Sequence, residues 1–134
     1  MKKQVIPFGD ALGLEVAYSN AISIDISESA RMVYISGQLA FNQDGKLIGK
    51  GDVSVQTDQC IKNIKEVLTE FNGSLDDIVQ VTVYVKEMTN LVDIHKVRLE
   101  YFNKPYPTST LIQISDFASK DALIEIEASA IIPI

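Results

Sequence analysis

The sequence predicts an α+β fold in which two helices cover one face of a single sheet. In two stretches, apolar residues recur every three or four positions, as in helices with one buried side. Around them lie shorter runs rich in β-branched residues, which favour strands. Turn residues separate these runs, and the predicted order is strand-strand-helix-strand-helix-strand-strand.

The first two strands are expected over 14–26 and 31–38, with a turn at 27–29 between them. The second is the clearer prediction, because strand-prone residues run without interruption until Ser36-Gly37. A cluster of turn residues follows at 42–45, and its Asp-Gly pair is favourable where the backbone needs positive φ.

The first helix is predicted over 53–72. Asp52 can accept hydrogen bonds from the free amides at its start, and Asn72-Gly73 supplies a left-handed stop. The spacing predicts one buried stripe, made of Ile61, Ile64, Val67, Leu68 and Phe71.

A strand is predicted over 78–85, and a second helix begins near Thr89 or Asn90 and ends before Pro105. The buried side of that helix is expected to consist of Leu91, Ile94, Val97, Tyr101 and Phe102.

Two further strands, 108–114 and 123–132, are joined through a turn at 119–121. In the last strand, apolar residues at even positions alternate with Glu125, Glu127 and Ser129. The apolar side suits the helices. The opposite side must meet either water or another subunit, and its composition is compatible with both.

The 134 residues fit a single domain over 1–134, and 46% apolar with 22% charged residues is typical of a soluble globular protein. No apolar stretch approaches the roughly 20 residues that cross a bilayer, and no apolar secretory core follows the N-terminus. A cytoplasmic location is therefore the default expectation.

Charge and cysteine content narrow the possible partners. Twelve basic against eighteen acidic residues give a net charge of −6, and no run of basic residues could neutralise several phosphates, so nucleic acid is not an expected partner. Cys60 and His95 are the only residues of their types, which excludes an intramolecular disulfide and a Cys/His zinc site. Helical spacing around Cys60 favours a core position over a nucleophile.

Several separated motifs, which together span nearly all of 18–132, identify the chain as resembling the reactive intermediate deaminase family, also called the RidA or YjgF family. These motifs are VYISGQLAF (33–41), SLDDIVQVTVYVKEM (74–88), KPYPTSTLIQI (104–114) and ALIEIEASAI (122–131). The resemblance implies a chorismate-mutase-like α+β protomer and a homotrimer with three clefts at the subunit boundaries. Sheets would face inward and helices outward.

The resemblance also implies a chemistry. Deaminating members hydrolyse imines such as 2-aminoacrylate to a ketoacid and ammonia without a metal or organic cofactor. Carried over by motif, Tyr18 matches a cleft tyrosine, Gly37 a position where the backbone approaches the ligand, and Glu125 the acid that orients water. Thr110 matches a position that contributes backbone contacts.

Purely structural explanations remain open beside these roles. Tyr18 could pack at a sheet edge with a wet hydroxyl, and Gly37 could serve backbone shape alone. Glu125 could be a solvated or interface carboxylate.

Thr108 stands where we expect the arginine of the deaminating members. A guanidinium holds a carboxylate through two charge-assisted hydrogen bonds, whereas threonine offers one neutral hydroxyl. Because hydrogen bonds to charged groups contribute about 1.5–3 kcal/mol, the loss would weaken binding on the order of 10–100-fold. Lys86 or Lys104 could supply a replacement charge, although a solvated lysine is the preferred interpretation of each.

Two functions therefore remain open. The chain could hydrolyse imine, enamine or related metabolites at inter-subunit clefts, with Glu125 directing water and the segment around Thr108 holding the substrate. Because Thr108 replaces the expected arginine, we do not expect standard 2-aminoacrylate deamination. Alternatively, it is a non-catalytic, small-molecule-binding or regulatory trimer.

Overall fold

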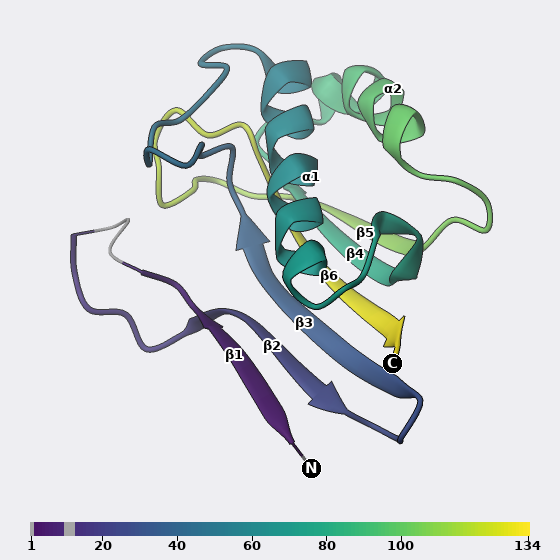
Figure 1. Ribbon diagram of the computed structural model, residues 1–134. Coiled ribbons are helices and arrows are strands. Elements are labelled where there is room, and N and C mark those ends of the chain that lie inside the picture. Colours follow the sequence, from purple (N-terminus) through teal and green to yellow (C-terminus); the bar gives the residue numbers. More distant parts are fainter. Residues whose placement is uncertain (1, 10–12) are drawn as a thin grey trace.

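The computed structural model describes residues 2–9 and 13–134, which form a six-stranded sheet and two α-helices (Figure 1). The strands are β1 (Lys3–Pro7), β2 (Ser19–Asp25), β3 (Ala30–Gln38), β4 (Ile78–Val85), β5 (Thr108–Gln113) and β6 (Ile124–Pro133). The helices are α1 (Val53–Glu70) and α2 (Leu91–Tyr101), with short 3₁₀ turns at Leu75–Asp77 and Met88–Asn90.

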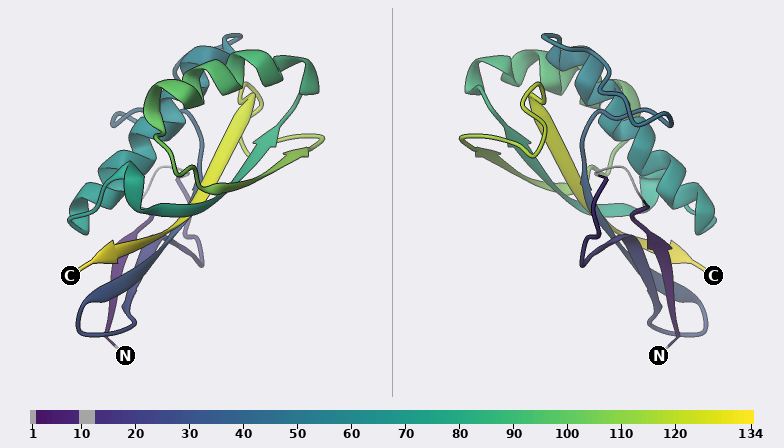
Figure 2. Two further views of the ribbon diagram at one scale, coloured as in Figure 1. Left: turned by 90° about the vertical axis from the view of Figure 1, so that its right-hand side faces the viewer. Right: turned by 90° about the vertical axis from the view of Figure 1, so that its left-hand side faces the viewer.

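The strand order across the sheet is β1-β2-β3-β6-β4-β5. All neighbouring pairs are antiparallel except β4 and β5, which are parallel and are joined through α2. A parallel pair needs such a crossover, because its strands start at the same edge of the sheet. Both helices lie on one side of the twisted sheet, as Figure 2 shows. The predicted α+β architecture is thereby confirmed.

Two features at the N-terminal end differ from the prediction. β1 was not predicted, because its mostly exposed residues give no one-sided alternation. β2 begins at Ser19 instead of position 14. Leu14, which suggested an earlier start, is 61% exposed and does not contribute to the core.

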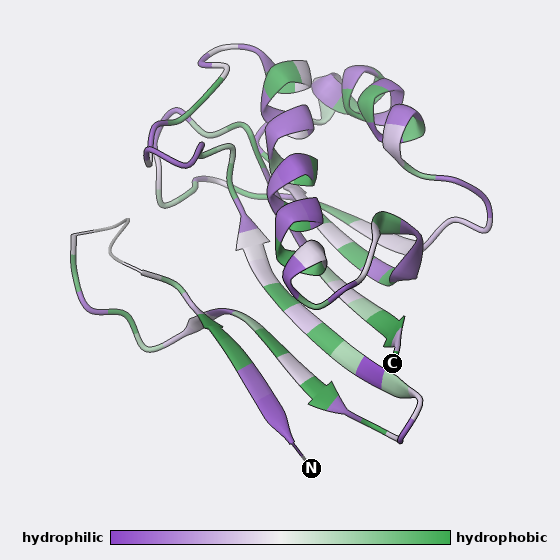
Figure 3. Cartoon of the chain, viewed as in Figure 1, coloured by the Kyte–Doolittle hydropathy of each residue, from purple (hydrophilic) through white to green (hydrophobic). Residues whose placement is uncertain are grey.

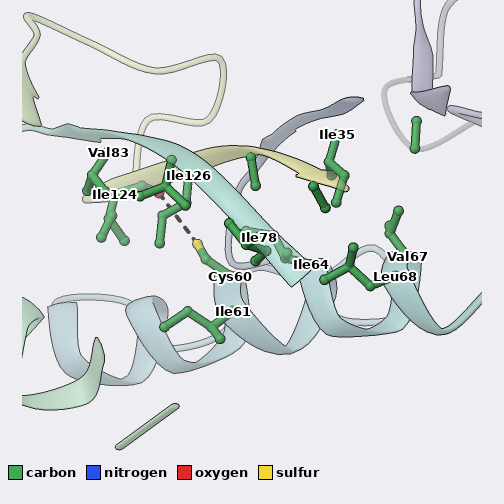
Figure 4. Close-up of a cluster of buried hydrophobic side chains, with 14 of the residues drawn as sticks. Ile35, Cys60, Ile61, Ile64, Val67, Leu68, Ile78, Val83, Ile124 and Ile126 are labelled. Carbon is green, nitrogen blue, oxygen red and sulfur yellow. Dashed lines mark hydrogen bonds between the residues drawn. The ribbon is translucent and has the colours of Figure 1, made fainter. Parts of the chain in front are cut away.

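The core fills the layer between the helices and the sheet. Along the strands, more hydrophobic residues alternate with less hydrophobic ones (Figure 3), and the more hydrophobic residues face the helices. Figure 4 shows part of this cluster, in which the Cys60 thiol points at the carbonyl oxygen of Ile124 at 3.8 Å. Cys60 has no exposed surface, and burial raises the pKa of its thiol. The predicted core role of Cys60 is confirmed.

The local signals that define α1 act as predicted. Asp52 accepts a hydrogen bond from the backbone N–H of Val55 at 3.1 Å, and Asn72 has a φ of 61° just beyond the helix. The predicted turn before α1 also forms, with the Gly45 amide donating to the Asn42 carbonyl at 3.0 Å. None of the described helices combines the length and apolar character needed to span a membrane.

Gln56 ties α1 to the segment that leads into β6. Its buried side-chain amide donates to the carbonyl oxygens of Gly49 and Asp121, each at 3.0 Å, and accepts from the Leu123 N–H at 2.8 Å. These bonds satisfy both ends of the amide, as a buried polar group requires. They fix the start of β6 and so the position of Glu125.

Candidate functional site

A bulge in β3 shapes the first candidate site. Ile35 pairs with Ala128 and Gln38 with Ile126, so β3 has one more residue than β6 in this interval. The extra length is held in place by side chains: the Ser36 hydroxyl donates to the Ser19 carbonyl oxygen at 2.7 Å.

Gly37, within this bulge, lies against the carboxylate of Glu125. A Cβ atom at position 37 would overlap Oε1 of Glu125. Glycine is therefore needed here for close approach, because any side chain would displace the carboxylate.

The region around this contact is a pocket of about 400 Å³, which we call the Glu125 pocket. Its lining includes Tyr18, Asn20, Gly37, Phe41, Asn63 and Glu125. Tyr18 is half exposed, and its ring meets that of Phe8 edge-on with centroids 4.8 Å apart. Three residues implied by the resemblance, Tyr18, Gly37 and Glu125, thus line the same pocket.

The environment of Glu125 favours its protonated form. Burial raises the pKa of this carboxyl, and the nearby charge of Glu127 adds to the rise. Glu127 in turn accepts a hydrogen bond from the Tyr84 hydroxyl at 2.9 Å. A carboxyl with a raised pKa holds its proton more readily than an ordinary carboxyl, which suits it to proton exchange.

Thr108 and Thr110 do not reach this pocket within one chain. They are level with Gln80 and Thr82 of β4, which places them on the face of the sheet away from the helices, the helix-free face. From the strand spacing of about 4.8 Å and the rise of about 3.4 Å per residue, Thr110 lies roughly 12 Å and Thr108 roughly 17 Å from Glu125. The Thr108 hydroxyl donates to the Val79 carbonyl oxygen at 3.2 Å.

A second pocket, of about 360 Å³, opens between α2 and β5; we call it the Arg98 pocket. It is lined by His95, Arg98, Leu99, Phe102, Tyr106, Pro107, Ser109 and Leu111. Ser109 is level with Val81, so it faces the helices, and its hydroxyl accepts a hydrogen bond from Arg98 Nη2 at 2.9 Å.

Arg98 is not among the residues predicted from the sequence, because the replacement cation was expected among the lysines near the strand motifs. Lys86 lies 3.4 Å from Asp116 and donates to the Lys120 carbonyl oxygen, so its charge is already engaged. One feature of the sequence could have identified Arg98. It lies three residues after His95, on the same side of the helix that precedes the motif at 104–114.

Comparison with known proteins identifies the family of the chain. The family described as "Endoribonuclease L-PSP" matches residues 8–132. The chain belongs to this family. It is also 36% identical to a "RutC family protein" of Pyrococcus abyssi over 113 residues, which cover 84% of each chain.

Solved structures of the RidA family share the fold. The conserved Rid-family protein YyfA of Yersinia pestis is 31% identical, with a TM-score of 0.81 over 96% of this chain and 98% of that one. TdcF of E. coli, solved with bound serine, is 28% identical, with a TM-score of 0.77 over 96% and 98% of the two chains. The family and its chorismate-mutase-like protomer are thereby confirmed, and membership supports a role connected with small molecules.

Proposed function

We propose that this RidA-family chain forms a homotrimer that hydrolyses imine, enamine or related metabolites at clefts between subunits. The observation that carries the proposal is the separation of the expected site residues. Tyr18, Gly37 and Glu125 line one pocket, whereas Thr108 and Thr110 lie on β5, two strands away from β6. With their backbones roughly 12 Å apart, the short Thr110 side chain does not approach Glu125 within one chain, which supports a site that a second subunit completes.

The edge of β5 is suited to completing that site in a neighbour. As the last strand of the sheet it leaves backbone N–H and C=O groups free along its outer side. Thr108, Ser109 and Thr110 are exposed and add hydroxyl groups. In the proposed cleft, this segment of one subunit meets the Glu125 pocket of the next.

Glu125 provides the chemistry. As a carboxylate it takes a proton from a water molecule, whose oxygen attacks the C=N carbon of the imine. The proton then passes to the nitrogen, which gives a carbinolamine. Glu125 next takes the proton of the new hydroxyl and passes it to the amino group, so that C=O forms, the C–N bond breaks, and a carbonyl compound and ammonia leave. The raised pKa of Glu125 supports this exchange, because the group can act as base and then as acid. No metal or organic cofactor is needed for these steps.

The bound serine of TdcF supports a ligand of amino-acid size in this fold. Serine carries an amino nitrogen on the carbon next to a carboxylate. An imino acid has the same arrangement of groups, which agrees with hydrolysis at C=N.

Ammonia release from freshly generated imines tests the proposal, with 2-aminoacrylate and imines of larger apolar amino acids as substrates. We expect the wild type to release ammonia and Glu125→Ala to lose the activity by about 100-fold or more, as for loss of a general acid–base. Gly37→Ala should also lose activity while remaining folded, because its methyl group displaces only the flexible end of Glu125. If the wild type releases no ammonia from any of the imines, the proposed hydrolase activity is wrong.

A non-catalytic binding or regulatory trimer is the second candidate. The absence of a charged group at Thr108 favours it, since the β5 segment then offers only neutral hydrogen bonds. This alternative predicts saturable ligand binding at the cleft that leaves the ligand chemically unchanged.

A further inference from the structure

The Arg98 pocket contains a positive charge that the protein itself does not neutralise. Among residues 2–9 and 13–134, the ion pairs within 4.0 Å involve Arg31, Lys50, Lys62 and Lys86, and none involves Arg98. The side-chain hydrogen bond of Arg98 within this range goes to the neutral hydroxyl of Ser109. Its guanidinium therefore keeps most of its donors for another partner.

Arg98 is also partly withdrawn from water. Burial lowers the pKa of its guanidinium, which means that solvation of its positive charge is reduced. In a chain with a net charge of −6, acidic side chains are abundant, yet none of the described ones lies beside this group. A partly desolvated cation without a counterion binds anions more strongly than a fully solvated one.

The other residues of the Arg98 pocket determine which kind of group can be attached to the bound anion. Its walls are mainly apolar and come from Leu99 and Phe102 of the α2 end, and from Pro107 and Leu111 around β5. His95 lies one helical turn before Arg98 and adds a polar group at the wall. A single guanidinium beside apolar walls matches one carboxylate on a short hydrocarbon tail.

We propose that Arg98 binds the carboxylate of a small, apolar-tailed ligand, with Ser109 orienting the guanidinium. The proposal assigns a carboxylate ligand to the Arg98 pocket, on the helix side of β5, and places the cation on α2 instead of on β5. Its link to Glu125 chemistry rests on the proposed function, whereas carboxylate binding in the Arg98 pocket is measurable by itself.

Phosphate is the main competing anion. It is strongly hydrated and mostly doubly charged at neutral pH, so one guanidinium between apolar walls compensates its desolvation poorly. A carboxylate has one charge and fits the guanidinium through two parallel hydrogen bonds.

The test is a titration of the ¹⁵N-labelled full chain, followed by NMR, with 3-methylbutanoate as the probe. The neutral amide 3-methylbutanamide and inorganic phosphate serve as comparison ligands. We expect saturable shifts at the Arg98 side chain and at the amides of Ser109 and Leu111, with a dissociation constant in the region of about 1 mM. The amide and phosphate should bind at least about tenfold more weakly.

Variants assign the binding to Arg98. Arg98→Gln should weaken binding of 3-methylbutanoate by about 10–100-fold, and Arg98→Lys should restore part of it, since lysine keeps the charge but not the fork. Lys96→Gln is the matched control: it removes one positive charge from the exposed side of the same helix, outside the pocket, and should leave binding unchanged. The dispersion of each spectrum reports whether the variant is folded.

Any of four results would overturn the inference. The acid and the amide bind equally, folded Arg98→Gln binds as well as wild type, no binding occurs at about 50 mM 3-methylbutanoate, or phosphate binds more tightly than 3-methylbutanoate. Ammonia release is measured separately on the same preparations. Carboxylate-selective binding without any imine hydrolysis would overturn the proposed hydrolase alone, whereas hydrolysis by a protein that fails the binding test would overturn the role of Arg98 alone.

Discussion

At the scale of single residues, the position of the Glu125 carboxylate depends on the absence of a side chain at Gly37. The carboxylate occupies the space that a Cβ atom would fill, and Glu127 lies near enough to raise its pKa further. Burial and a like charge both disfavour the ionised form. The arrangement therefore costs stability when Glu125 is ionised, as is common for groups at functional sites.

Glu125→Gln should change the pH dependence of stability. Because the folded-state pKa is raised above its ordinary value of 4.5, the stabilisation that Glu125 provides is complete below that value and is lost as pH rises through the folded-state pKa. Glutamine does not ionise. On going from about pH 4 to about pH 7, the free energy of unfolding of the variant should therefore rise relative to that of wild type. The rise should be at most about 1 kcal/mol, since solvent screens a partly exposed carboxylate.

Urea unfolding at both pH values and a fixed protein concentration measures this gain. Glu127→Gln is the matched comparison, because it removes the neighbouring charge while Glu125 can still ionise. A difference between Glu125→Gln and wild type that stays constant with pH would show that Glu125 titrates normally.

At the scale of elements, α1 positions the site through both its start and its side. Asp52 satisfies a free amide at the N-terminus, and one turn later Gln56 binds the segment before β6. A change in the first turn of α1 is therefore transmitted to the strand that carries Glu125.

Asp52→Ala should lower the free energy of unfolding by about 1 kcal/mol, because the Val55 N–H loses its side-chain acceptor. Asp52→Asn, which keeps an oxygen acceptor, should remain close to wild type. Chemical denaturation of the three proteins measures the difference. Equal destabilisation by both substitutions would show that charge, and not the capping hydrogen bond, is what matters at this position.

At the scale of the whole molecule, the helix-free face is the surface that the chain leaves uncovered. Large apolar side chains remain exposed on it, including Tyr34, Ile112 and Ile131. Glu125, Glu127, Thr108 and Thr110 share this face. Exposed apolar groups around polar ones are typical of a surface that contacts another protein chain.

Sedimentation at micromolar concentration should give three times the protomer mass of 14.8 kDa. Ile112→Glu, on the helix-free face, should shift the mass toward that of the monomer, since it buries a charge in the proposed interface. Val92→Glu is the control, because Val92 is 66% exposed on α2 and outside that face. A monomeric wild type, or equal dissociation by both variants, would contradict the proposed assembly.

The α+β architecture could be predicted from the sequence, because every main element except β1 carries a local signal. The stripe of α1, its Asp52 cap and the alternation of β6 all depend on residues close together in the chain. The roles of Tyr18, Gly37, Glu125, Thr108 and Thr110 stay predictions from the resemblance.

The grouping of the candidate residues depends on strand pairing and packing, and it could not be predicted from local patterns. β1 forms because β2 is available to pair with it, although its own residues carry little signal. The register of β5 on β4 turns Thr108 and Thr110 toward the helix-free face and Ser109 toward Arg98. These contacts could not be predicted from local sequence patterns. They depend on strand pairing and on the packing of a crossover helix, which bring together side chains that are far apart in the chain.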